Sequence, residues 1–327
     1  MTKTIDASIE ASLALAVEAI LSTDEEIALA CHITPDGDAL GSMLALHLAL
    51  RSQGRKSVAS FSEPFAVADH YRGLSGLDAL TSPSDYPAEP RLMITFDVGS
   101  IDRLGGLTHS AESAQELIVL DHHVSNTRFG TINVIDPNAA ATGVVVRRLL
   151  SMLGIPLTRD VAINLYAALI CDTGRFQYES TTPDVFELAS ELASFDLPIP
   201  ELSRTLFEEH RFAYLGLMGE AISKMVLEPE RSFVWLALTQ DMLTRHDCTL
   251  DEAEGLIDIV RRAREAQVAC ILKEEVDGSI KVSLRSVGTT DVCRIAQANG
   301  GGGHRFAAGF TSHLDMDATL GVIRAAL

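Results

Sequence analysis

The sequence has few cysteines and no pattern that pairs them. The five cysteines are an odd number, and none of them forms a C-x-x-C pair; they are Cys31, Cys171, Cys248, Cys270 and Cys293. This spacing does not support a disulfide framework or a zinc site. Cys31 and Cys171 lie inside apolar runs, so we interpret them as small buried hydrophobic residues.

Positive charge is also scarce. The chain has 26 lysines and arginines against 45 aspartates and glutamates, which gives a formal net charge of −19. Such a chain repels long polyanions, so we expect no binding to long duplex nucleic acid. A local phosphate site built from a few cationic groups and metal ions is not excluded.

No apolar run is long enough to span a membrane. The longest stretch near the N-terminus, residues 11–21, is interrupted by Ser12 and Glu18, and a spanning helix needs about 20 apolar residues. Lys3 is the only basic residue before it, and Asp6 and Glu10 occupy positions where a signal peptide needs positive charge. We therefore predict a cytoplasmic protein with no membrane partner.

The order of apolar segments predicts an α/β protein of two domains. Short strands at 27–33, 58–61, 92–98, 117–120 and 131–135 alternate with helical segments at 40–50, 142–153 and 161–170, which favours a mainly parallel sheet with helices on both faces. We predict this domain over residues 1–190 and a helical linker over 191–212. A smaller α/β domain follows over 213–327, with strands at 233–238, 268–274 and 280–284 and helices at 250–264, 292–298 and 316–326.

Three polar residues follow the first predicted strand. His32, Asp36 and Asp38 have the spacing H-x3-D-x-D, and ligands of open α/β sheets bind beyond the carboxyl ends of strands. Imidazole and carboxylate together suit Mn²⁺, Zn²⁺ or Fe²⁺. The same segment is also typical of a polar turn, since it contains Pro35 and Gly37.

Further acidic and imidazole groups follow other apolar segments. Asp97 ends the strand LMITF, Asp121, His122 and His123 end LIVL, and Asp172 follows AALIC. Asp97 alone would be interpreted as a cap. Gathered in one site, these groups would concentrate negative charge that only cations stabilise. Carboxylates shared by two ions about 3.5–4 Å apart are typical of two-metal hydrolysis.

The C-terminal part contains candidate phosphate-binding residues. Arg285 and Ser286 end the segment KVSLRS, and the run Gly300–Gly303 precedes His304 and Ala307-Ala308-Gly309. Glycines allow backbone N–H groups to approach a phosphate closely, and Arg285 and His304 add side-chain donors. A glycine run alone is more often a flexible loop.

The order of these motifs resembles the DHH phosphoesterase superfamily with its DHH-associated C-terminal domain. The resemblance extends from about residue 27 to residue 310, and it is greatest to compact bacterial enzymes described as nanoRNase and 3′-phosphoadenosine 5′-phosphate (pAp) phosphatase. It implies two divalent ions, with Mn²⁺ expected. One ion would be bound by His32, Asp36 and Asp97, and the other by Asp38, Asp97, His122 and Asp172.

The resemblance also implies roles for the remaining motif residues. His123 would face the scissile phosphate as a catalytic group, together with the bridging Asp97. Substrate would be bound by a second set: Arg285, Ser286, Gly301, Gly302, Gly303 and His304. The implied substrates are short RNA and nucleotides, including pApA-type dinucleotides and pAp. Members of the family often form homodimers through the N-terminal domain, and the sequence leaves this open.

Three alternative functions remain open. Family II inorganic pyrophosphatases and polyphosphatases share the N-terminal motifs, but the glycine run with His304 counts against them. A RecJ-like exonuclease would carry additional nucleic-acid-binding modules. A nucleotide sensor without catalysis is disfavoured because the expected metal ligands are complete.

Overall fold

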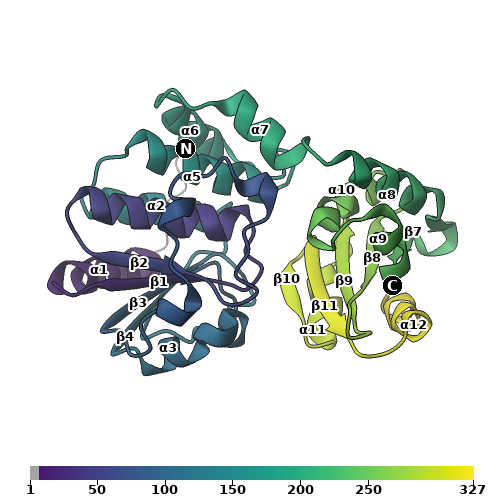
Figure 1. Ribbon diagram of the computed structural model, residues 1–327, viewed down its shortest axis with the longest axis horizontal. Helices are drawn as coiled ribbons and strands as arrows, with labels where there is room; N and C mark the ends of the chain where they lie inside the picture. The colour runs from purple at the N-terminus through teal and green to yellow at the C-terminus, as the bar shows by residue number, and fades with distance from the viewer. Residues whose placement is uncertain (1–6) are drawn as a thin grey trace. The chain divides into compact units, whose positions relative to one another are not determined.

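The computed structural model describes residues 7–327, which form two compact units. The first unit ends at Leu206, and the second comprises Phe207–Leu327. Both units have an α/β architecture (Figure 1), so the predicted fold class is confirmed.

The first unit is built on a parallel five-stranded sheet. Its strand order is β2-β1-β3-β4-β5, and every neighbouring pair is parallel. Because all strands point the same way, their carboxyl ends lie along one edge. The strands are β1 (Ile27–Cys31), β2 (Ser57–Ser60), β3 (Leu92–Phe96), β4 (Glu116–Asp121) and β5 (Ile132–Ile135).

Helices cover the sheet of the first unit on both faces. One face contacts α1, α2 and α4, and the other packs against η4 and α3. Next to α2 lies α5, and α6 packs on α5. The α-helices are α1 (Ala7–Ser22), α2 (Gly37–Ser52), α3 (Thr108–Ser113), α4 (Thr142–Met152), α5 (Arg159–Asp172), α6 (Pro183–Ala193) and α7 (Ile199–Phe207). The 3-10 helices are η1 (Asp69–Tyr71), η2 (Leu77–Ala79), η3 (Pro83–Asp85) and η4 (Ile101–Leu107).

Helix α2 is buried almost all round because it lies between the sheet and α5. Its side chains are apolar on nearly every face, which is typical of a helix with no solvent-exposed side. At Gly41 the two helices approach closely, since a Cβ there would lie 2.5 Å from the carbonyl oxygen of Asn164. This contact brings the start of α2 and the end of α5 to the same edge of the unit.

A mixed six-stranded sheet forms the centre of the second unit. The order is β10-β11-β9-β8-β7-β6, and only the β7–β8 pair is parallel among the described strands. The strands are β6 (Val226–Glu228), β7 (Phe233–Leu238), β8 (Val268–Glu274), β9 (Ile280–Ser286), β10 (Gly302–His304) and β11 (Ala307–Ser312).

Apolar clusters form on both faces of this second sheet. One cluster joins Leu236 and Ile271 of the sheet to helices that include α8, and the other joins Val282 and Leu284 to α11 and α12. The helical elements are α8 (Phe212–Ser223), η5 (Pro229–Arg231), α9 (Gln240–His246), η6 (Asp251–Leu256), α10 (Ile257–Val260), α11 (Val292–Ala298) and α12 (Met316–Ala326).

One local prediction differs from the structure. The helix predicted over 250–264 is divided into the 3-10 helix η6 and a single turn, α10, and Gly255 weakens a regular helix at this point. For the glycine run the sequence left a flexible loop open as an alternative, and in the structure two of its glycines, Gly302 and Gly303, pair with β11 as part of β10.

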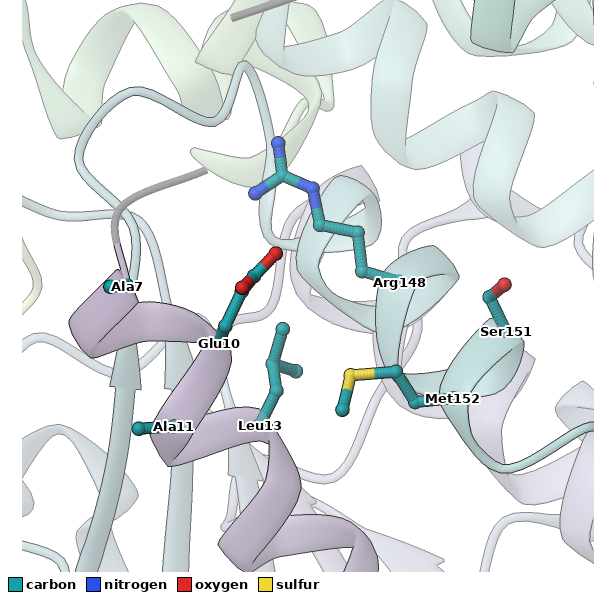
Figure 2. A pocket seen from close by; sticks show the side chains of 7 residues that line it. All are labelled: Ala7, Glu10, Ala11, Leu13, Arg148, Ser151 and Met152. Atoms are coloured by element: carbon teal, nitrogen blue, oxygen red, sulfur yellow. The ribbon is translucent and has the colours of Figure 1, made fainter. Parts of the chain in front are cut away.

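A surface pocket of the first unit lies away from the predicted site residues. Glu10 and Leu13 on α1 face Arg148 and Met152 on α4 across this hollow (Figure 2). Within residues 7–327 no helix is sufficiently long and apolar to cross a bilayer. The cytoplasmic location and a homodimer stay predictions.

Candidate metal centre

The predicted metal ligands of the first unit meet at the carboxyl edge of its sheet. His32, Asp97 and His122 follow β1, β3 and β4, while α2 begins beside Asp36 and Asp38 and α5 ends at Asp172. Parallel strands bring these positions together although up to 140 residues separate them along the sequence. The residues brought together are His32, Asp36, Asp38, Asp97, His122 and Asp172.

One group consists of His32, Asp36 and Asp97. The Nε2 atom of His32 lies 3.9 Å from Asp36 Oδ2 and 3.7 Å from Asp97 Oδ2. Its other nitrogen, Nδ1, donates a hydrogen bond of 2.8 Å to the carbonyl of Ile33. This bond places the unprotonated lone pair of a neutral imidazole on Nε2, which is the arrangement of a metal-binding histidine.

A second group surrounds His122 in the same way. Its Nε2 atom lies 3.0 Å from Asp172 Oδ2, 3.5 Å from Asp97 Oδ1 and 3.6 Å from Asp38 Oδ2. Nδ1 lies 3.1 Å from the carbonyl oxygen of Ala139, to which it donates. The ligand atoms of Asp38, Asp97 and His122 lie within 4.8 Å of one another.

Asp97 belongs to both groups. Its Oδ2 atom faces His32, whereas Oδ1 faces His122. The residue is buried and has a φ of 59°, a left-handed conformation that aspartate adopts more readily than most residues. Backbone strain of this kind is concentrated at functional sites. The geometry suits a carboxylate that bridges two ions.

The start of α4 holds two of these carboxylates, and the sequence did not reveal this. Thr142 donates its backbone N–H to Asp38 Oδ2 at 2.6 Å and its hydroxyl to Asp97 Oδ1 at 2.9 Å. Asp38 Oδ1 also accepts bonds of 2.9 Å from Gly143 N and Ser42 Oγ. The only sequence signal was a Thr-Gly pair at the start of a predicted helix, which is common at helix starts generally.

A hydrogen-bonded set orients His123. Its Nδ1 atom lies 2.7 Å from Asp121 Oδ1, and Asp121 is fully buried. Asn126 donates to Asp121 Oδ2 at 2.5 Å and to the carbonyl of Val98 at 2.9 Å. Asp121 therefore fixes the ring of His123, and Asn126, which sequence reasoning missed, fixes Asp121.

Asp36 combines the two interpretations that the sequence left open. Its Oδ1 atom caps α2 by accepting bonds from Asp38 N and Ala39 N at 3.1 and 3.0 Å, as expected of a turn or helix cap. Its Oδ2 atom is the one that faces His32. One carboxylate can serve both roles, because each oxygen serves one.

The pKa shifts in the cluster indicate an excess of negative charge. Burial and the neighbouring Asp97 and Asp172 raise the pKa of Asp38 well above its ordinary value. Burial opposes ionisation of Asp97 too, but His123 and the other imidazoles outweigh it and lower the pKa of Asp97. Burial alone would lower the pKa of His122, yet Asp172 raises it well above the usual range. The raised pKa values of Asp38 and His122 mean that the negative charge of the cluster favours bound protons. Divalent cations can supply the same compensating charge, so the cluster suits them.

Comparison with known proteins shows the family to which the chain belongs. The model of the DHH family, N-terminal domain, matches residues 26–169, and the DHHA1 domain model matches residues 233–326. The bifunctional oligoribonuclease and PAP phosphatase NrnA of Thermus thermophilus is 32% identical over 308 residues, which cover 93% of this chain and 89% of that protein. The chain belongs to the DHH family.

Two further similar proteins cover a similar extent of the chain. The protein of the same name from Bacillus subtilis is 27% identical over 88% of this chain and 90% of its own. A crystal structure of an exopolyphosphatase-related protein from Bacteroides fragilis superposes on this chain with a TM-score of 0.87 and is 26% identical in sequence. The superposition covers 100% of this chain and 97% of the Bacteroides fragilis chain. The likeness therefore includes both units.

In the second unit of this DHH protein, Arg285 and His304 share one face of the sheet. Arg285 pairs with Ala307 of β11, which pairs with His304 of β10, and directly opposed residues of antiparallel strands point to the same side. The Nε atom of Arg285 is buried without a hydrogen-bond partner within the described residues. The small side chain of Ala307 lies between them in this register.

The structure does not bring Ser286 to that face. Ser286 follows Arg285 along β9, so its side chain points to the opposite side, and its hydroxyl donates to the carbonyl of Thr290 at 2.7 Å. Gly301 has a structural reason to be glycine, because a Cβ would lie 2.1 Å from the carbonyl oxygen of Gly309. Substrate-binding roles for Ser286 and for Gly301, Gly302 and Gly303 stay predictions.

Proposed function

We propose that this chain is a two-metal phosphoesterase that hydrolyses short oligonucleotides, including pApA-type dinucleotides, and pAp to mononucleotides. The observation that supports this most directly is the pair of ligand groups that share Asp97. Membership of the DHH family supports it as well, and the relatives at 27–32% identity are named for oligoribonuclease and PAP phosphatase activity.

We assign one ion to His32, Asp36 and Asp97, and the other to Asp38, Asp97, His122 and Asp172. Mixed imidazole and carboxylate donors suit Mn²⁺, which we propose as the metal. When bound, the ions neutralise the carboxylates, polarise the phosphate and activate a water molecule.

His123 acts on the scissile phosphate from a fixed position. Asp121 accepts a hydrogen bond from Nδ1, so it stabilises the imidazole in the form that carries protons on both nitrogens. Nε2 can then donate to a phosphate oxygen or to the leaving oxygen. Asp121 plays the orienting part that a carboxylate plays beside histidine in other hydrolases.

We assign substrate binding in the second unit to Arg285 and His304. Guanidinium and imidazole N–H groups are strong donors to phosphate, and both side chains share a face of the second sheet. A chain with a net charge of −19 offers little attraction to additional phosphates. We therefore expect turnover to be fastest for substrates of about two to four nucleotides and to fall with length.

A second candidate function is hydrolysis of pyrophosphate or polyphosphate. It is favoured by the likeness to the exopolyphosphatase-related structure from Bacteroides fragilis. The residues of the metal centre would serve that reaction equally well, since both reactions cleave a phosphorus–oxygen bond. The two candidates differ in whether a nucleoside is required.

One substrate panel tests both candidates. The purified chain is assayed with Mn²⁺ on pAp, pApA, RNA of graded length, pyrophosphate and polyphosphate, and kcat/KM is compared. We expect the dinucleotide and pAp to lead the panel and a decline toward long RNA. Faster turnover of pyrophosphate or polyphosphate would favour the second candidate, and a flat or rising length profile would indicate a processive exonuclease.

A further inference from the structure

The backbone directly after Asp172 has an uncommon conformation. Gly174, Arg175 and Phe176 have φ values of 54°, 61° and 63°, so three consecutive residues lie in the left-handed region. Residues other than glycine rarely adopt it, least of all large ones such as phenylalanine. Such a segment persists only where its surroundings hold it, and strain of this kind is concentrated at ligand-binding and catalytic sites.

Thr173 is the residue that holds this segment. It is fully buried, and its hydroxyl donates to the carbonyl of Leu169 at 2.6 Å and accepts from Phe176 N at 3.2 Å. Its carbonyl accepts from Gln177 N at 2.9 Å and from Tyr178 N at 3.0 Å. Phe176 is thus fixed relative to the end of α5, where Asp172 lies.

Phe176 stacks on a second phenylalanine that remains open to solvent. Its ring centroid lies 5.4 Å from that of Phe186 on α6, with an interplanar angle of 28°. The Phe186 residue is 55% exposed, and among the described phenylalanines only Phe212 is more exposed. A stack of this geometry leaves an aromatic surface on the outer side of Phe186.

The aromatic pair is connected to the metal centre by a short stretch of chain. Phe176 follows Asp172 by four positions, so even a fully extended chain would place its Cα no more than about 14 Å from that of Asp172, and the ring centroid of Phe186 lies 5.4 Å from that of Phe176. In a nucleotide substrate the base is one sugar away from the phosphate. A base that stacks here would add binding without requiring charge, and stacking tolerates any base because every base has a π-face.

We propose that Phe186, supported by Phe176, is a stacking surface for a nucleobase of the substrate. This inference rests on the proposed function, since it places the base of a nucleotide whose phosphate lies at the metal centre. Phe176 and Phe186 determine specificity for nucleosides over bare phosphates, and Thr173 positions Phe176.

Binding of AMP and ribose 5-phosphate to the full chain with Mn²⁺ tests the proposal, because the two probes differ only in the adenine. The variants are Phe186→Leu and Phe176→Leu, which keep an apolar side chain but remove the ring. Phe212→Leu, an exposed phenylalanine of the second unit, is the matched control. We expect Phe186→Leu to weaken AMP binding at least about 5-fold and to leave ribose 5-phosphate binding unchanged, and the control to change neither.

The proposal is overturned if the wild-type chain does not prefer AMP to ribose 5-phosphate. It is also overturned if Phe186→Leu weakens both probes equally or neither. Hydrolysis of pAp is measured in parallel. The two proposals can fail separately. If Phe186→Leu loses the preference for AMP but the wild-type chain hydrolyses no nucleotide, the stacking surface is supported and the proposed function is refuted. Hydrolysis without an adenine preference would support the proposed function and refute the stacking surface.

Discussion

Replacing Thr142 with valine should weaken metal binding without removing any ligand. The Thr142 hydroxyl donates to Asp97 Oδ1 at 2.9 Å in a buried setting. Valine has the same shape, so the change removes one hydrogen bond and little packing. Bonds to charged groups contribute about 1.5–3 kcal/mol, and loss of a partner that orients a metal ligand reduces affinity about 10- to 100-fold. We expect a loss of that size for Mn²⁺.

The assay is a Mn²⁺ titration by calorimetry, with thermal unfolding of the metal-free chain measured alongside. Thr142→Ser is the matched control, because it keeps the hydroxyl and the backbone N–H that Asp38 accepts. Serine should bind Mn²⁺ nearly as the wild type does. Equal affinities for the valine and wild-type chains, with both folded, would refute the view that Thr142 orients Asp97.

Three further predictions concern charge, packing and pH. Asp97→Asn should abolish turnover and lower the Mn²⁺ content while the fold is kept; a variant with two bound ions and near-normal activity would exclude a bridging role. Gly41→Ala should lower the free energy of unfolding by about 1–3 kcal/mol, since its Cβ would meet the Asn164 carbonyl at 2.5 Å; denaturant titration measures this, and an unchanged midpoint would contradict it. Burial, with a smaller effect of Arg51, lowers the pKa of His47 to about 4, so below the ordinary value near 6.5 the unfolded chain takes up a proton that the folded chain does not. Between pH 7.5 and pH 5 stability should therefore fall by about 2 kcal/mol more in the wild type than in His47→Gln, and equal pH slopes in the two chains would refute this.

The general fold could be predicted because its signals are local. Short apolar strands that alternate with helices specify a parallel sheet, and the five strands of the first unit occur where the sequence placed them. The broken helix after Thr249 could not be predicted. The helical pattern of residues 250–264 does not reveal that the segment will divide into a 3-10 helix, which contains Gly255, and a single α-helical turn that ends at Val260.

The ligand types of the candidate metal centre could be predicted, but not its supporting groups. His32, Asp97 and His122 each stand at the end of an apolar strand, where a charged residue is conspicuous. Thr142 and Asn126 are ordinary polar residues in the sequence, and their importance arises only from long-range contacts. Thr142 lies 104 positions from Asp38, and no short pattern encodes a contact over that distance.

The supporting groups explain why so many carboxylates can be buried together. Asp38 accepts hydrogen bonds from two backbone N–H groups at the start of α4 and from a hydroxyl, and the helix N-terminus adds a favourable dipole. These contacts stabilise the ionised form, yet burial and neighbouring carboxylates still raise the pKa of Asp38. Hydrogen bonds therefore orient the cluster but do not neutralise it. The remaining charge must come from cations, and the same deficit that makes the metal-free site costly gives it affinity for the ions.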